Sequence, residues 1–260
     1  MDDARVDRFL RDGFVVLRGA VPGDLVERCR EILWRDLPED PDDPSTWTRP
    51  VARLGGYAQE PFRLAANTPV LRAAYDRLAG AGRWAEPGGL GTFPVRFPHP
   101  DAAGDDGWHI EGSYAMDGET WPFANVFSRG RLMLLLFLFS DVSEDDAPTR
   151  VRIGSHLETP RHLQRAGEAG LSVLDVCTNG LVDATAGLPE ALVTGRAGDV
   201  FLCHPFLVHA AQSHRGRVPR VMAQPPLLPR QAGEEVRLER PDGDYSPVEI
   251  AIRRGLADLL

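Results

Sequence analysis

The apolar residues of the first 35 positions change their spacing twice, which predicts a helix, a strand and a second helix. The first helix is expected to end at Gly13, and the apolar run Phe14–Leu17 that follows is typical of a strand. The second helix is expected to follow Pro22, with Asp24 as its N-cap and Glu27 completing a capping box. The residues expected on the buried faces of the two helices are Val6, Phe9, Leu10, Leu25, Cys29, Ile32 and Leu33.

Two further helices are predicted from their first residues. Thr68 and Pro69 begin one of them, and Ser246 and Pro247 begin the other, where Glu249 completes a capping box. The apolar stripes of these helices are Val70, Leu71, Ala74, Tyr75 and Leu78 in the first, and Val248, Ile252, Leu256 and Leu259 in the second. The acidic, proline-rich residues 36–46 predict an exposed loop.

From about residue 88 the pattern changes to short β-type runs between clusters of Gly, Pro and Asp. The expected strands are Leu90–Phe97, Leu132–Phe139, Arg150–Ile153, Asp199–Cys203 and Arg220–Ala223. Because Leu132–Phe139 is apolar on both faces, it should be buried on both sides. Residues 158–196 are expected to leave the sheet as a partly helical excursion. We therefore predict a mainly β fold with flanking helices, a single jelly-roll domain over residues 1–260.

Composition narrows the function classes. The 260 residues are 43% hydrophobic and 26% charged, as in ordinary soluble proteins, and the net charge of −9 with no visible basic face argues against nucleic-acid binding. All 29 basic residues are Arg, which excludes lysine Schiff-base chemistry. The three cysteines form no CxxC pair, and no apolar run is long enough to span a bilayer. We expect a cytoplasmic monomer without a signal peptide that binds a small molecule and no membrane.

The segment around His109 holds the first candidate chemistry. In an extended segment, His109 and Glu111 point to the same side. An imidazole and a carboxylate on one side form two-thirds of a facial triad, the ligand set that holds non-haem Fe(II) and leaves other positions open. The pattern is short and occurs in many chains, so a solvated turn is the alternative. The third ligand must be a distant histidine.

Two pairs of residues could supply that histidine and a nearby arginine: His204 with Arg215, or His209 with Arg220. An arginine on the adjoining strand would bind a co-substrate carboxylate through two hydrogen bonds. Arg215 falls in an expected turn, whereas Arg220 opens an expected strand, so we choose His209 with Arg220. We interpret His204 as structural and His214 as a surface turn residue.

Four segments in order along the chain resemble the phytanoyl-CoA dioxygenase (PhyH-like) family of Fe(II)- and 2-oxoglutarate-dependent oxygenases. The segments are Phe9–Val16, Trp108–Ser113, Ala147–His156, and Gly198–His209 followed by Arg220. Four motifs in the right order are far more specific than any one of them. The family has a double-stranded β-helix fold, which agrees with the predicted jelly roll.

The resemblance implies a role for each candidate residue. His109, Glu111 and His209 would be the iron ligands, and Arg220 would hold the distal carboxylate of 2-oxoglutarate. Arg96 would make a polar contact to the other end of that co-substrate. Such an enzyme uses O₂ and releases succinate and CO₂, and its default outcome is hydroxylation of a small molecule. Trp108 and Tyr114 are candidates for the substrate pocket, with core packing as the alternative, and His156 is interpreted as structural.

The chain departs from the family pattern at three positions. Glu111 stands where the family has Asp, Ala211 where a hydroxyl residue is usual, and Ile153 where Pro is usual. The extra methylene of Glu111 would let it bind from further away, or through both oxygens. Two other hypotheses therefore stay open: a catalytically silent β-helix that binds a small molecule, and a jelly-roll metalloenzyme that does not use 2-oxoglutarate. The sequence does not identify the substrate.

Overall fold

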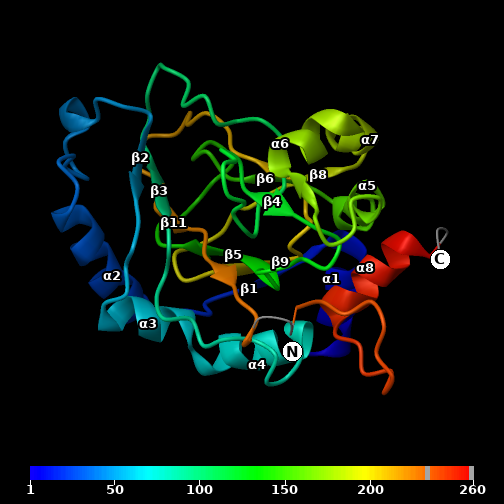
Figure 1. Cartoon of the computed structure of the whole chain (residues 1–260). Coiled ribbons are helices and arrows are strands. Elements are labelled where there is room, and N and C mark those ends of the chain that lie inside the picture. The colour runs from blue at the N-terminus through cyan, green and yellow to red at the C-terminus, as the bar shows by residue number, and fades with distance from the viewer. Residues whose placement is uncertain (232–234, 258–260) are drawn as a thin grey trace.

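The computed structural model describes residues 1–231 and 235–257, and a five-stranded antiparallel sheet lies at its centre (Figure 1). The strand order is β1-β9-β5-β11, and β12 also pairs with β5. Its strands are β1 (Phe14–Leu17), β9 (Val200–Cys203), β5 (Met133–Leu138), β11 (Met222–Ala223) and β12 (Pro226–Leu227). The predicted strand Phe14–Leu17 is confirmed, and its pairing with β9 joins the start of the chain to residues almost 190 positions later.

A second sheet packs against the first and completes the double-stranded β-helix. Its strands, in order, are β10 (His209–Ala210), β6 (Arg150–Arg152) and β8 (Glu190–Leu192). Two further strand pairs flank the sheets: β2 (Val51–Leu54) with β3 (Phe93–Arg96), and β4 (Phe123–Ala124) with β7 (Leu171–Ser172). The predicted excursion of residues 158–196 therefore ends early, because β8 returns to pair with β6.

Strand β5 is buried on both faces, as its sequence predicted. Leu134, Leu136 and Leu138 pack toward the second sheet together with Val151 of β6. The alternate residues of β5, such as Leu135, pack into the larger core beneath the helices. A strand at this position has no solvent-facing side, which explains its unbroken apolar run.

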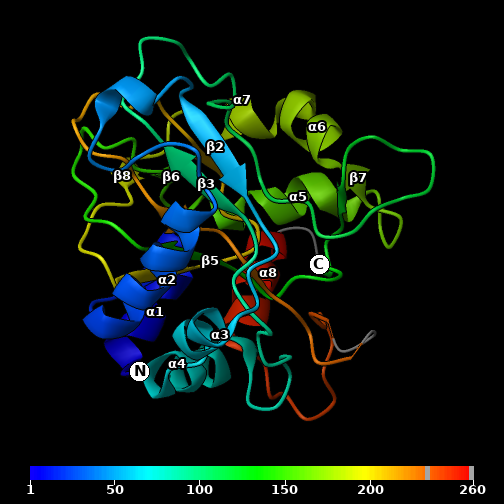
Figure 2. The same cartoon turned by 90° about the vertical axis from the view of Figure 1, so that its left-hand side faces the viewer.

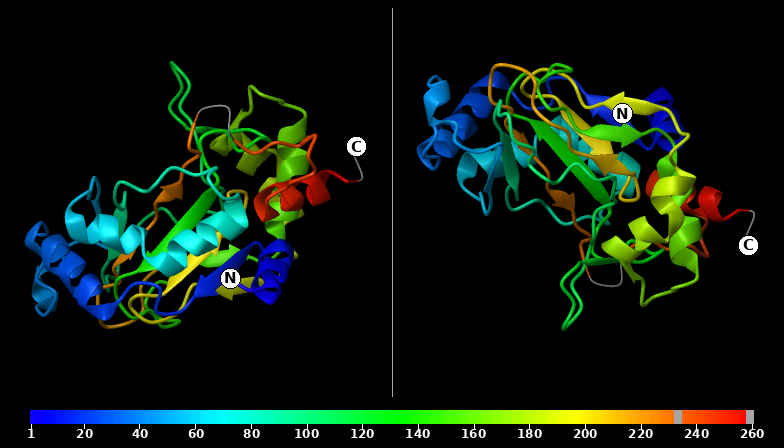
Figure 3. Two further views of the ribbon diagram at one scale, coloured as in Figure 1. Left: turned by 90° about the horizontal axis from the view of Figure 1, so that it is seen from below. Right: turned by 90° about the horizontal axis from the view of Figure 1, so that it is seen from above.

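The helices form two groups around the sheets (Figures 1 and 2). The first group covers one face of the main sheet, and α4 crosses that face (cyan in Figure 3, left). It consists of α1 (Asp3–Asp12), α2 (Gly23–Arg35), α3 (Glu60–Ala66), α4 (Pro69–Ala79) and α8 (Pro247–Leu256), with η1 (Pro44–Thr46) beyond α2. The second group consists of η2 (Ser155–Leu157), α5 (Thr159–Gln164), α6 (Val173–Val176), η3 (Cys177–Leu181) and α7 (Val182–Ala184). Within the described residues, no helix is both long and apolar enough to cross a membrane.

Local signals predicted some helix ends and missed others. Gly13 ends α1 in the left-handed conformation, with φ of 86°, and the capping box of Ser246 and Glu249 begins α8. The predicted N-cap Asp24 is wrong, because the N-cap position of α2 is Pro22, two residues earlier, and no side chain caps the helix. Helix α3 was not predicted. Leu259, expected on the buried stripe of α8, lies outside the described residues.

Some segments differ from the sequence expectation in extent or burial. The expected strand Leu90–Phe97 is shorter, since β3 spans Phe93–Arg96, and β11 begins at Met222 rather than Arg220. The acidic loop 36–46 is not wholly solvated. Its Glu39 is 3% exposed and pairs with Arg49, because burying that carboxylate requires a counter-charge.

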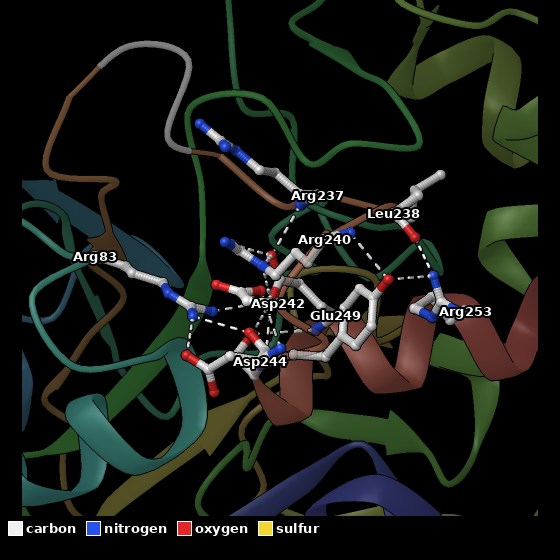
Figure 4. A network of polar contacts seen from close by, with 10 residues as sticks. Arg83, Arg237, Leu238, Arg240, Asp242, Asp244, Glu249 and Arg253 are labelled. Carbon is white, nitrogen blue, oxygen red and sulfur yellow. Dashed lines mark hydrogen bonds and ion pairs between the residues drawn. The ribbon is translucent and has the colours of Figure 1, made fainter.

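A buried ion pair fixes the end of the chain (Figure 4). The Glu249 carboxylate, 2% exposed, accepts hydrogen bonds from Arg240 at 2.5–3.0 Å and from the Nη1 of Arg83 at 3.1 Å. It also accepts the backbone N–H of Ser246, the N-cap of α8. One carboxylate thereby joins helix α8, the segment before it and the loop after α4, and its pKa is lowered because these donors outweigh the effect of burial.

Two histidines are buried together where α1, η2 and α8 meet. His156 and His204 are both 0% exposed, and their ring centroids lie 5.0 Å apart. His156 contacts the Leu10 carbonyl through Nε2, and His204 contacts the Val248 carbonyl. Burial lowers the pKa of His156 to about 4, although the Leu10 carbonyl and then the charge of Asp12 oppose the effect, and burial also lowers the pKa of His204. Both imidazoles are therefore neutral in the folded protein at pH 7.

This pair predicts loss of stability in mild acid. In the unfolded chain His156 binds a proton near pH 6.5, so between there and about pH 4 the unfolded state holds more protons and the folded state loses stability as pH falls. Urea titrations at pH 7 and pH 4 measure how much unfolding free energy each protein loses on acidification. The loss should be smaller in His156→Gln than in the wild type, by on the order of 3 kcal/mol. His162→Gln, on the outer helix α5, is the control. An equal loss of stability in the wild type and His156→Gln would contradict the lowered pKa of His156.

Candidate metal centre

Backbone pairing brings His109 and His209 together although 100 residues separate them. Each donates its backbone N–H to the carbonyl of the other, at 2.9 Å in both directions. Residues paired in this way point their side chains to the same side, and the two imidazole centroids lie 4.4 Å apart. Glu111, two residues after His109, joins them. The candidate ligand atoms of the three residues lie within 4.8 Å of one another.

The hydrogen bonds of both imidazoles leave Nε2 facing the centre of this cluster. His109 donates its Nδ1–H to the Gly107 carbonyl at 2.8 Å, and His209 donates its Nδ1–H to the Leu207 carbonyl at 2.9 Å. Carbonyl contacts of this kind orient a metal-binding histidine and determine which nitrogen carries the proton. Burial, followed by the nearby His209, lowers the pKa of His109, so its imidazole is neutral and able to bind a metal.

Glu111 supplies a carboxylate whose two oxygens meet different partners. Oε1 lies 3.5 Å from Nε2 of His209, and Oε2 lies 3.7 Å from Nη2 of Arg131. Burial would raise the pKa of Glu111, but the neighbouring His209, Arg131 and His109 lower it to about 2. The carboxylate is therefore ionised. Two imidazoles and one carboxylate on one side match the facial triad of non-haem iron proteins.

An unsatisfied atom tests whether this set fits a metal ion. The Nε2 of His209 is buried and has no hydrogen-bond partner among the described residues. Buried polar atoms are almost always hydrogen-bonded, so such an atom requires an explanation. A divalent metal bound by Nε2 of His209 would provide one, and the donor set of the cluster suits such an ion.

A second backbone pairing places Arg96 and Arg220 side by side. Arg96 donates its N–H to the Arg220 carbonyl at 2.9 Å, and Arg220 donates back at 2.8 Å. Arg220 is 1% exposed, its side chain contacts the Ala147 carbonyl, and its Nε has no partner within the described part of the chain. Burial and Arg96 lower the pKa of Arg220 to about 9, opposed by Asp105. The nearest anion to Arg96 is Asp105, at 2.7 Å.

A cavity of about 220 Å³ joins the histidines to the arginines. The residues that line it are Arg53, Thr92, Pro94, Arg96, Asp105, His109, Thr149, His209, Ala211, Arg220 and Gln224. Arg53 pairs with Asp105 as Arg96 does, so only Arg220 among these cations meets no close carboxylate in the described structure. Two groups at the cavity wall could therefore accept a ligand: the Nε2 of His209, which has no hydrogen-bond partner among the described residues, and the Arg220 guanidinium, which contacts two carbonyls but no carboxylate there.

The sequence analysis missed several residues of this region. Asp105 precedes the metal motif in an acidic loop that gave no signal of function, and Thr149 lies in the third family-like segment but was not singled out. Arg131 and Gln224 lie in segments without a motif, and only the fold brings them near the site. Thr149 is the one with a signal in the sequence: Ala211 stands where the family usually has a hydroxyl residue, and another hydroxyl residue could take its place.

The alternative pair His204 and Arg215 is not brought to the site. His204 is buried in the core beside His156, and the Arg215 side chain is 68% exposed and pairs with Asp145. The expectation that His214 is a surface residue is wrong. It is 9% exposed, and the Gly216 N–H donates to its Nδ1, so the turn folds inward over it.

The two aromatic residues proposed for a substrate pocket do not line this cavity. Trp108 contacts two guanidinium groups, with Arg150 at 4.6 Å and Arg152 at 4.3 Å from its ring centroid. Tyr114 donates its hydroxyl to the Ala169 carbonyl at 2.8 Å. Trp108 therefore fixes the loop before His109 against β6, a packing role that favours the core alternative.

Solved structures share the fold at low sequence identity. The epimerase SnoN from nogalamycin biosynthesis, solved with Fe³⁺, alpha ketoglutarate and nogalamycin RO, is 19% identical, with a TM-score of 0.57 over 85% of this chain and 81% of that chain. HygX from Streptomyces hygroscopicus, solved with nickel, 2-oxoglutarate and hygromycin B, is 21% identical, with a TM-score of 0.53 over 86% of each chain. The carbocyclase SnoK, also from nogalamycin biosynthesis, is 17% identical, with a TM-score of 0.51 over 86% of this chain and 82% of that chain.

The sequence itself identifies the family. A search of curated proteins found no match. Residues 9–222 match the family described as phytanoyl-CoA dioxygenase (PhyH), and this span contains all four motif segments as well as both backbone pairings of the site. The chain therefore belongs to the phytanoyl-CoA dioxygenase (PhyH) family.

Proposed function

We propose that the protein is a non-haem Fe(II)- and 2-oxoglutarate-dependent oxygenase that acts on a small molecule. His109, Glu111 and His209 would hold the iron, and Arg220 would anchor the co-substrate. One observation carries the proposal: in the described part of the chain, the unpartnered Nε2 of His209 and the guanidinium of Arg220, which meets no carboxylate there, face one cavity of about 220 Å³. A dicarboxylate between a metal and an arginine would satisfy both.

The residues of the site would hold the metal and orient its ligands. When bound, the iron would activate O₂, the oxidant of the reaction, which would consume O₂ and 2-oxoglutarate and release succinate and CO₂. His109 and His209 would present Nε2 to the metal, because carbonyl oxygens accept their Nδ1 protons. Glu111 contributes one negative charge, which a divalent ion requires in a buried site.

The co-substrate would bind through the arginine end of the cavity. Arg220 is buried and rigidly held, so its guanidinium is oriented to meet a carboxylate through two hydrogen bonds. Arg96 lies beside Arg220 rather than at the opposite end, so we revise its expected contact to the same carboxylate. The hydroxyl of Thr149, 3% exposed on the cavity wall, would replace the one absent at Ala211.

The finer outcome of the reaction depends on the substrate. Hydroxylation remains our proposal, in which one oxygen atom of O₂ enters the substrate and the other enters succinate. Two proteins of the same fold are named an epimerase and a carbocyclase, so other oxidative outcomes are compatible with this architecture. A silent binding protein is the second candidate, because Glu111 and Ala211 depart from the family pattern.

Anaerobic addition of Fe(II) and 2-oxoglutarate to the metal-free protein tests the proposal. A visible charge-transfer band should form only when both are present, because the band arises from 2-oxoglutarate chelated to Fe(II). His209→Ala should abolish the band, whereas His162→Ala, on the outer helix α5, should retain it. Absence of both the band and Fe(II) uptake in the wild type would overturn the oxygenase and favour the binding protein.

Replacing Arg220 separates a 2-oxoglutarate enzyme from other metalloenzymes of this fold. Loss of a charged hydrogen-bond partner should weaken 2-oxoglutarate binding by about 10- to 100-fold in Arg220→Ala, with Fe(II) affinity unchanged. Arg215→Ala removes an exposed arginine five residues away and should change neither. Calorimetric titration measures both affinities. Unchanged 2-oxoglutarate affinity in Arg220→Ala would falsify the anchoring role.

A further inference from the structure

The carboxylate of Glu111 is shared between the proposed metal and a buried arginine. Oε1 faces Nε2 of His209 at 3.5 Å, while Oε2 faces Nη2 of Arg131 at 3.7 Å. The two oxygens therefore have separate partners. Because Glu111 has one methylene more than the aspartate usual in the family, it could otherwise turn both oxygens to one ion.

Arg131 is fixed in a position that serves Glu111 and no other carboxylate of the described residues. It is 9% exposed, and its Nη2 donates to the Gly112 carbonyl at 3.1 Å, one residue after Glu111. Its Nε and Nη1 are buried without hydrogen-bond partners in the described ranges, and Glu111 is the one carboxylate there that pairs with it. A buried guanidinium is costly without a counter-charge, and Glu111 supplies that charge here.

The backbone on both sides holds the pair in register. Gly130 has φ of 79°, and a Cβ at this position would lie 2.6 Å from the Ser113 carbonyl oxygen. Only glycine therefore allows the segment before Arg131 to approach the segment after Glu111 this closely. Ser113 in turn donates its N–H to the Phe123 carbonyl at 2.7 Å. The carboxylate and the guanidinium thus lie on two segments that approach each other closely.

The number of oxygens that Glu111 supplies determines how many positions remain around the metal. An octahedral ion has six positions, of which two histidines and one carboxylate oxygen take three. A co-substrate that chelates takes two more, and one is left for O₂. A glutamate bound through both oxygens would remove one of these positions.

We propose that Arg131 is a positioning residue that retains Oε2 of Glu111, so that only Oε1 binds the metal. The inference rests on the proposed metal site and adds to it a reason why Glu can replace Asp here. The guanidinium and the glutamate act as a matched pair, because a shorter aspartate could not contact both the metal and Arg131.

A double-mutant cycle between the two residues tests this role. The proteins are the wild type, Arg131→Gln, Glu111→Asp and the double variant, each loaded with Co(II). Arg131→Gln should weaken 2-oxoglutarate binding by about tenfold, an effect typical of groups that orient metal ligands. Its Co(II) d–d spectrum without 2-oxoglutarate should also change in position or intensity, because a second oxygen of Glu111 would replace another ligand of the ion. In the Glu111→Asp background, the same change should leave both readouts nearly unaltered.

Further variants separate the charge of Arg131 from its packing. Arg131→Lys keeps a positive charge beside Oε2 and should restore most of the 2-oxoglutarate affinity. Arg129→Gln removes a charge from an exposed position in the same segment and should have no effect. If Arg131→Gln does not fold, Arg131→Met removes the charge without burying an unpaired amide.

The possible failures are distinguishable. If the wild type binds neither Co(II) nor 2-oxoglutarate, the proposed function fails and this inference falls with it. If the wild type binds both, three results would overturn the role of Arg131 alone. These are unchanged affinity in Arg131→Gln, equal losses in the wild-type and Glu111→Asp backgrounds, and a Lys variant as impaired as the Gln variant.

Discussion

Antiparallel backbone pairing between distant segments is the constraint on which the site depends. His109 pairs with His209, and Arg96 pairs with Arg220, each through two reciprocal hydrogen bonds. Thirteen residues separate the first members and eleven separate the second, so both pairs lie on the same two neighbouring segments. A slip of one residue would turn these side chains to the opposite face and separate the histidines from the arginines. These two bridges thus determine the spacing between the proposed metal ligands and the proposed co-substrate anchor.

Much of this arrangement was predictable from local patterns. The strand Phe14–Leu17, the doubly buried run around β5 and the capping box of α8 each follow from signals within a few residues. The choice of Arg220 over Arg215 also came from local structure, since one was expected in a strand and the other in a turn. The structure places Arg220 on the cavity wall and Arg215 in solvent.

Features that depend on tertiary contacts escaped prediction. Arg131 lies in no sequence motif. Its proposed role follows from its contact with Glu111, which the close approach of the two segments at Gly130 allows. The burial of His214 was not predicted, because burial of a turn depends on what packs over it. The start of α2 at Gly23 was not predicted, since Asp24 resembles an N-cap residue in the sequence but the helix begins directly after Pro22.

The central claim is that the metal and Arg220 hold the two ends of one ligand. Titrating 2-oxoglutarate anaerobically by calorimetry into the metal-free protein and into the Mn(II)-loaded protein tests it most directly, because Mn(II) suits the same donor set without oxidative turnover. The account predicts one binding site per chain and much tighter binding to the loaded protein. Equal affinity with and without the metal, or no binding to either form, would contradict it.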